Sequence, residues 1–206
     1  MANTELTLTQ VLTGEVRISY EHLMKPYTKN GREEDAKYSC TLLIPKSDTT
    51  TKQRIDAAIQ KAIQAGVSKV WGGARPAQPP IPVWDGDGLR QNGEKFGPEC
   101  AGCWVMTASS KQRQAVMDRN GDPIIDSTEI YSGMYARVIV NFYPYNSNGR
   151  RGIGAGLGGV QKLRDGDPLG GRVDAAAIFG ANPFGAGASA VAAGNVDPIT
   201  GEPRPW

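Results

Sequence analysis

Apolar and polar residues alternate along several stretches of this chain with a period of two. In the clearest stretch, 135–143, one set of positions is small, β-branched or aromatic: Ala136, Val138, Val140 and Phe142. The other set holds Tyr135, Arg137, Ile139, Asn141 and Tyr143. This alternation predicts a β-strand with one face on a core. Pro144 cannot donate to a strand ladder, so pairing is expected to stop there or continue only as an edge.

Shorter patterns of the same kind predict further strands at 6–20, 37–44, 103–108 and 153–163. The first two are expected to pair antiparallel around the polar loop 25–35. In the first, Val16, Ile18 and Tyr20 form one face, opposite Arg17 and Ser19. A further hairpin, built on Asn120-Gly121, is expected to join 115–118 to 123–125.

The period changes to 3.6 residues in one segment only. Its apolar stripe consists of Ile55, Ala58, Ile59, Ala62, Ile63 and Val67. This stripe predicts an amphipathic helix over about 50–70 that packs on the core, with Ser47, Asp48 or Thr49 as its N-cap. One helix among many short strands indicates a mainly β domain over 1–180.

Two segments lack a regular pattern. Residues 72–98 are rich in proline and glycine and predict an irregular excursion with a short extended piece at 81–84. In it, Trp84 either stacks on a ligand or covers one end of the core, and the second reading is favoured. From 181 to 206 Gly, Ala, Asn and Pro dominate, which predicts a flexible tail. The tail ends in Trp206, a candidate anchor for a partner protein.

The amino-acid composition excludes some classes of protein but does not identify one. The 206 residues include 23 basic and 21 acidic ones, a net charge of +2, so the chain lacks the strong basic excess of many duplex and RNA binders. Three cysteines do not make a disulfide framework, and no stretch approaches the length of an apolar membrane span. These features predict a soluble, cytoplasmic protein.

The alternating strand at 135–143 carries an unusual second face. Its tyrosines and arginine are followed by Tyr145, by Arg150 and Arg151, and by a glycine-rich run. Rings that stack on bases, together with guanidinium groups that hold phosphates, suit a single-stranded nucleic acid. The same residues also occur as ordinary cross-strand partners, so the pattern alone leaves both interpretations open.

Other candidate chemistry is weaker. The run 154–159 satisfies G-x-G-x-x-G, but no helix is expected to open after it. The glycines more simply let the backbone lie close to a neighbouring strand or ligand, or bend a barrel. Cys100 and Cys103, with Cys40 and His22, could supply four zinc ligands, yet the last two are isolated. A magnesium-dependent nuclease that uses Asp85 and Asp87 is the enzyme alternative. A structural or interaction protein with no ligand is the third possibility. We expect no catalytic residue, metal or cofactor.

In chain order, the sequence resembles the phage-encoded OB-fold single-stranded-DNA-binding proteins, long catalogued as a family of unknown function. The segments that carry the resemblance are 16–20, 37–46, 85–87, 129–135, 142–146, 152–157 and 162–166. The resemblance implies a five-stranded Greek-key barrel with an inserted helix, which binds single-stranded DNA during phage replication or recombination in the infected bacterial cell. Similar proteins often end in a strongly acidic tail, whereas this tail has only Asp197 and Glu202 as acids. Recruitment of phage replication or recombination proteins through the tail is therefore open.

Taken together, these observations predict sequence-tolerant binding of single-stranded DNA without chemistry. Tyr135, Tyr143 and Tyr145 are expected to stack on bases. The cations expected to neutralise phosphates are Arg17, Lys111, Arg113, Arg137, Arg150, Arg151, Lys162 and Arg164.

Overall fold

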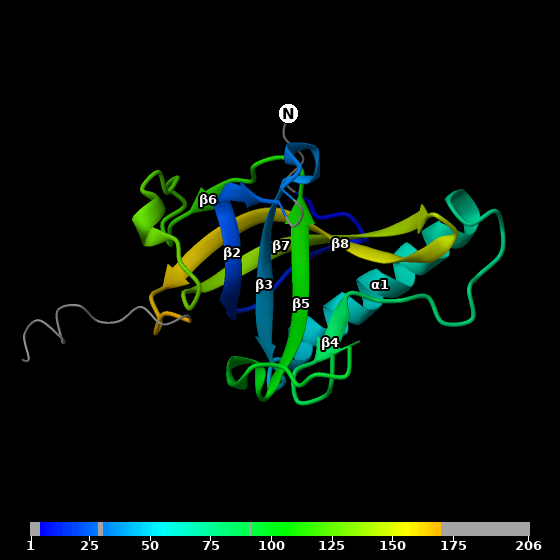
Figure 1. The fold of residues 1–206 in the computed structure, drawn as a ribbon, viewed down its shortest axis with the longest axis horizontal. Helices are drawn as coiled ribbons and strands as arrows, with labels where there is room; N and C mark the ends of the chain where they lie inside the picture. Colours follow the sequence, from blue (N-terminus) through cyan, green and yellow to red (C-terminus); the bar gives the residue numbers. More distant parts are fainter. Residues whose placement is uncertain (1–4, 29–30, 91, 170–206) are drawn as a thin grey trace, which may run out of the picture. The chain divides into compact units, whose positions relative to one another are not determined.

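Long strands close on one another into a barrel (Figure 1). The computed structural model describes residues 5–28, 31–90 and 92–169. Around the barrel the order is β2 (Val16–Tyr27), β3 (Lys37–Pro45), β5 (Cys103–Ser110), β8 (Arg150–Arg164) and β7 (Tyr135–Ser147), which pairs again with β2. Neighbours are antiparallel except β5 and β8, which are parallel. This arrangement is a five-stranded Greek-key barrel, and it confirms the expected OB-fold.

Short elements extend the barrel. They are β1 (Gln10–Leu12) beside β7, β4 (Val83–Asp85) beside β5, β6 (Val116–Met117) beside β8, and 3₁₀ turns at Glu33–Asp35, Pro98–Cys100 and Ser127–Glu129. The expected hairpin on Asn120-Gly121 forms, since Ile124 N donates to Val116 O. The expectations for 181–206, including Trp206, lie outside the described residues.

The predicted strand at 6–20 is wrong in two respects. It is interrupted between β1 and β2 at Gly14, whose N–H donates to Thr51 Oγ1 at 2.8 Å. A Cβ at Gly14 would collide with the Asp48 carboxylate, so the strand ends against the start of the helix. In addition, β2 continues to Tyr27 through a bulge in which Tyr20 has a φ of 46°. The bulge shifts the alternation, so Tyr20 is exposed and Leu23 takes the next core position.

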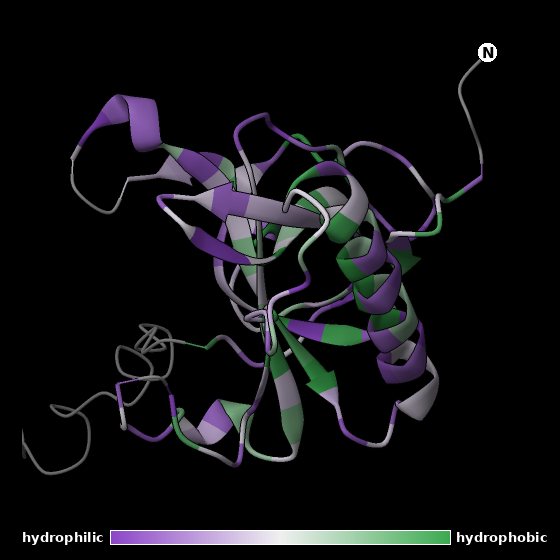
Figure 2. Cartoon of the chain, turned by 90° about the vertical axis from the view of Figure 1, so that its right-hand side faces the viewer, coloured by the Kyte–Doolittle hydropathy of each residue, from purple (hydrophilic) through white to green (hydrophobic). Residues whose placement is uncertain are grey.

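The predicted helix is confirmed as α1 (Thr49–Lys69). Asp48 caps it by accepting a hydrogen bond from Thr51 N. Its stripe of Ile55, Ile59 and Ile63 is buried and joins the barrel core of Val138, Phe142 and the other inward residues. In Figure 2 the hydrophobic and hydrophilic residues of the helix lie on different sides.

Strand pairing does not stop at Pro144. Strands β7 and β8 continue as a long hairpin to the Ser147–Arg150 pair, with Pro144 opposite Ile153. Phe142 N donates to Thr9 O on the edge of β7 that faces β1, and Pro144, two residues on, points its nitrogen the same way. The proline therefore removes no β7–β8 bond. The hairpin extension rests on α1 and on the turn that follows it, in which Trp71 Nε1 donates to Tyr145 O at 2.9 Å.

Candidate nucleic-acid interface

The outer face of β3 and β5 is a shallow floor of small hydroxyl side chains. Register places Ser39 opposite Ser109 and Thr41 opposite Thr107. The two threonine hydroxyls hydrogen-bond to each other at 2.9 Å. Short side chains keep the sheet surface low, so an extended ligand can approach the strands closely. In an OB-fold this is the face that binds oligonucleotides or oligosaccharides.

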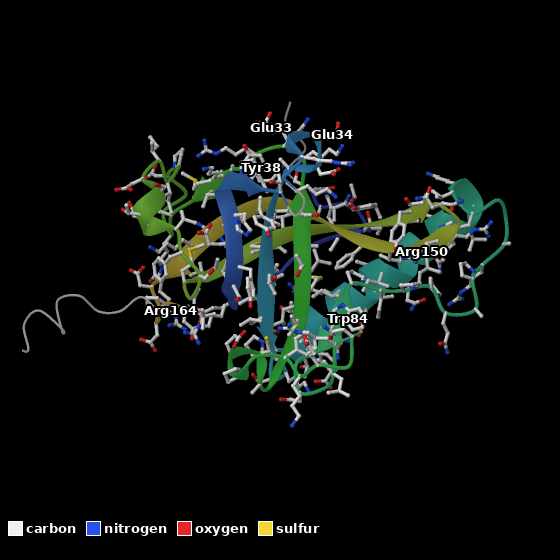
Figure 3. The ribbon with its side chains drawn as sticks, viewed as in Figure 1. Glu33, Glu34, Tyr38, Trp84, Arg150 and Arg164 are labelled. Carbon is white, nitrogen blue, oxygen red and sulfur yellow. The ribbon has the colours of Figure 1, made fainter. Side chains whose placement is uncertain are left out.

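Trp84 and Phe96 form a wall on one side of this floor. They pack on a second hydrophobic cluster of Leu43, Cys100 and Val105, which lies outside the barrel core. Both rings line a groove of about 450 Å³ that reaches Thr107. The expectation that Trp84 covers the barrel core is therefore wrong: alternation along β5 turns Val105 outward, and Trp84 lies opposite it in register. Figure 3 shows Trp84, the central residue of β4, near the start of β5.

A polar clamp fixes the turn that follows Trp84. Lys46 Nζ lies 2.6 Å from Asp85 Oδ1 and 2.7 Å from Asp87 Oδ2. Asp87 also accepts a hydrogen bond from Gly102 N at 2.9 Å. The hydrogen bonds from Lys46 hold the pKa of both carboxyl groups below their ordinary range. The ammonium group of Lys46 forms ion pairs with both carboxylates and so ties this turn to the end of β3. Because the two carboxylates are already paired with a cation, the arrangement does not favour the magnesium-nuclease alternative.

Tyr143 and Tyr145 lie over glycines of β8. A Cβ on Gly154 would lie 2.6 Å from the Tyr143 ring, and one on Gly152 would lie 2.6 Å from the Tyr145 hydroxyl. The close-approach reading of the glycine run is therefore confirmed, and the run lies inside a strand, not before a helix. Gly156 pairs with Ser109 of β5, so the surface of the tyrosines continues onto the hydroxyl floor.

Arg150 and Arg151 occupy the tip of the same hairpin. Arg150 is exposed, Arg151 is half-buried, and neither has an ion-pair partner among the described residues. Lys111 is exposed just after β5, and Arg113 donates to the sulfur of Met24 at 3.2 Å. The structure thus brings Tyr143, Tyr145, Arg150 and Arg151 together on one hairpin.

The remaining predicted residues lie toward the other end of the β7–β8 pair, and Figure 3 labels Arg150 and Arg164 at its two ends. The Tyr135 ring has Arg164 at 3.4 Å and Arg17 at 5.8 Å from its centroid. Arg164 pairs with Glu15 at 2.7 Å, which raises the pKa of its guanidinium.

Other cations of this region are also engaged within the protein. Arg17 donates to Asp167 O at 2.6 Å. Lys162 pairs with Asp165 at 2.8 Å, and Arg137 donates to Gln161 Oε1 at 2.6 Å. These contacts hold the end of β8 and the segment that follows it. The predicted site residues therefore form two groups and not one.

The candidate zinc ligands are separated. Cys40 is in the barrel core and Cys100 is in the second cluster, where Cys103 packs beside it. Burial raises the pKa of the Cys40 thiol to about 12, which disfavours the thiolate that a metal requires. No group of three or more metal-binding side chains was found in the part of the chain that the structure describes.

Sequence reasoning missed several aromatic rings and one cation. Phe96 has Arg90 at 5.2 Å from its centroid, in the same groove as Trp84. Tyr27 stacks on His22 at 4.7 Å beside the β2–β3 edge, and Tyr20 is 64% exposed. The signal that could have found Phe96 is an aromatic residue within a proline- and glycine-rich segment, the same signal that made Trp84 a candidate.

The barrel order and the bordered outer face place this chain in the OB-fold class, whose members bind oligonucleotides or oligosaccharides there. The family model described as the single-stranded-DNA-binding protein of Enterobacter phage Enc34 matches residues 9–188. The chain therefore belongs to this family of phage proteins.

Individual relatives agree with this membership. Putative protein p50 of Acyrthosiphon pisum secondary endosymbiont phage 1 is 32% identical over 164 residues, which cover 77% of this chain and 85% of p50. The bacteriophage Enc34 protein in complex with single-stranded DNA superposes with a TM-score of 0.67 at 29% identity, covering 79% of this chain and 90% of that one. Gp2.5 of bacteriophage T7 shares the fold, with a TM-score of 0.55 at 17% identity over 87% of this chain and 98% of gp2.5. Among the described helices, none is long and apolar enough to cross a membrane.

Proposed function

We propose that this protein binds single-stranded DNA without reading its sequence and without chemistry, in phage replication or recombination within the infected bacterial cytoplasm. One observation carries the proposal: in a family of phage single-stranded-DNA-binding proteins, this chain has a low hydroxyl floor bordered by aromatic rings and cations. Aromatic rings can stack on any base, because every base has a π-face. The short hydroxyl side chains of the floor leave room for the sugar-phosphate backbone of the DNA.

The strand is proposed to run over the β3–β5 floor between the Trp84–Phe96 wall and the Tyr143 side, and to continue over the hairpin. Trp84 and Tyr143 stack on bases, while Arg90, Arg150 and Arg151 neutralise phosphates. Support for this path comes from the pairing of Gly156 with Ser109, which joins the two surfaces. The predicted cations at the other end of the β7–β8 pair contribute less, because their charged groups already hold hydrogen-bond or ion-pair partners in the protein.

Fluorescence anisotropy of labelled oligo-dT, measured at several salt concentrations, tests the binding. The affinity is expected to fall steeply with salt, by a slope of about −0.7 per phosphate contact. Incubation of labelled DNA with magnesium should leave it intact. Fragments would instead support the nuclease, and no change in anisotropy would support a protein without this ligand.

The Trp84→Ala variant tests the path. Loss of one stacked ring is expected to weaken binding by about 1–3 kcal/mol, which is about 5- to 150-fold. Leu89→Ala is the matched control, because Leu89 is a 59% exposed apolar side chain on the same excursion. Equal affinities for the two variants would remove Trp84 from the proposed path.

A further inference from the structure

A second groove lies between α1 and the start of the chain, and it shares no lining residue with the Trp84 groove. Its volume is about 490 Å³. One wall includes Leu6, Leu8 and Leu12. Leu6 is 47% exposed and Leu8 is 78% exposed. Figure 2 shows the segment that follows the N-terminus running beside the helix. Exposed aliphatic side chains that gather on the wall of one groove, and are not scattered singly over the surface, are a feature of interaction surfaces.

The helical wall has a regular chemistry. Arg54, Ala57, Ala58 and Lys61 line it, at the spacing that places residues on one stripe of a helix. The two alanines keep the centre of the stripe low, and a cation stands at each end. Neither Arg54 nor Lys61 has an ion-pair partner among the described residues, whereas Lys52 on the same helix pairs with Asp56 at 2.6 Å. Among the residues that the structure describes, no acidic one lines the groove.

The third feature is a strand edge that is open beyond Gln10, whose own N–H donates to Thr7 O at 2.9 Å. β1 pairs with β7 along one edge and, within the described ranges, has no strand on the other. Thr9 O and Thr13 N bond to β7, so the backbone of Leu12, which alternates with them, points to the open side. An extended peptide can add to such an edge through main-chain hydrogen bonds, while pockets beside the edge select its side chains.

We propose that this groove docks an extended segment of another protein, in which acidic residues alternate with large apolar ones. The main chain of the segment pairs with the open edge of β1. Its apolar side chains lie between Leu8 and the alanines of α1, and its carboxylates reach Arg54 and Lys61. The site is separate from the proposed DNA path, so a partner bound there does not compete with the nucleic acid.

Selection of a random peptide library on the immobilised full-length protein tests this chemistry. The recovered peptides are expected to be enriched in Asp or Glu alternating with Leu, Ile or Phe. A synthetic, fluorescently labelled copy of the most frequent peptide should lose affinity about ten-fold or more for the R54E/K61E variant, because two attractive charges become repulsive. K69E/R75E is the control, since it carries the same charge change on residues that do not line the groove.

A second variant, Ala57→Trp, fills the groove without a change of charge and should also abolish peptide binding. Both variants alter exposed residues, so their melting temperature and oligo-dT affinity should match the wild type. Recovered peptides without acidic enrichment, or equal peptide binding by R54E/K61E, would overturn the proposal. Self-association that Leu8→Glu abolishes would also overturn it, because the occupant of the groove would then be a second copy of the chain. A loss of oligo-dT affinity in R54E/K61E would overturn it as well, because the groove would then not be separate from the DNA path.

Discussion

The two ends of the β7–β8 pair carry the same residue types in different states. Toward the barrel end, Tyr135 lies against Arg164, and Glu15 neutralises that arginine. At the hairpin end, Tyr143 is 43% exposed, and Arg150 and Arg151 have no ion-pair partner among the described residues. A ring or cation that the protein already uses must give up that contact before it binds a ligand. Residue type alone therefore does not define a binding residue. The contacts that a side chain already makes within the protein decide whether it is available to a ligand.

The largest expected effect on DNA affinity comes from replacing one tyrosine at each end of the β7–β8 pair by alanine. Tyr143→Ala should weaken oligo-dT binding by about 1–3 kcal/mol, because an exposed stacking surface is lost. Tyr135→Ala removes the same side chain from the same face of the same strand and should change the affinity far less. Anisotropy titrations of both variants at one salt concentration measure the difference. Equal losses would show that the two ends contribute alike.

The arginines at the two ends of the β7–β8 pair should likewise differ in their contribution to DNA binding, with a smaller effect than the tyrosines. Arg150→Ala combined with Arg151→Ala should reduce the salt slope of binding by about 1.4, since each phosphate contact contributes about 0.7. Arg17→Ala combined with Arg164→Ala removes the same charge from the other end and should leave the slope nearly unchanged. The slopes come from titrations at several salt concentrations. A reduced slope in the second variant alone would reverse the assignment.

The smallest effect concerns the clamp at Lys46, a third place where charges are already paired. The pKa values of Asp85 and Asp87 are lowered in the folded protein, so the pair stabilises the fold above the ordinary carboxyl pKa of about 3.9. This contribution is lost as the pH falls through the lowered values. Melting temperatures of the wild type and Lys46→Met should therefore differ at neutral pH and converge in acid. A difference that is independent of pH would assign the effect of Lys46 to packing.

The barrel core and the helix follow directly from the sequence, because period is a local property. One face of the strand must be buried because apolar residues alternate from Ala136 to Phe142, and one face of the helix must be buried because an apolar stripe runs from Ile55 to Ile63. Both requirements hold whichever element packs against that face. The resemblance to the phage family, carried by short segments in order, predicted the closed barrel and its class. The misreading at Tyr20 has a local cause, because a single bulge changed the phase of β2. At Pro144 the direction of one nitrogen decided between the two expected outcomes, and the strand continues past the proline as an edge paired only with β8.

Only the tertiary structure decided which side chains are available to a ligand. Trp84 and Phe96 lie in a segment without a pattern, and packing over Val105 brings them beside the β5 face. In the same way, Glu15 meets Arg164 across 149 positions of sequence, a pairing that no local pattern encodes. Sequence periodicity fixes which face of an element is buried. The partners that a polar or aromatic side chain finds depend on contacts between distant segments, and these exist only once the barrel has closed.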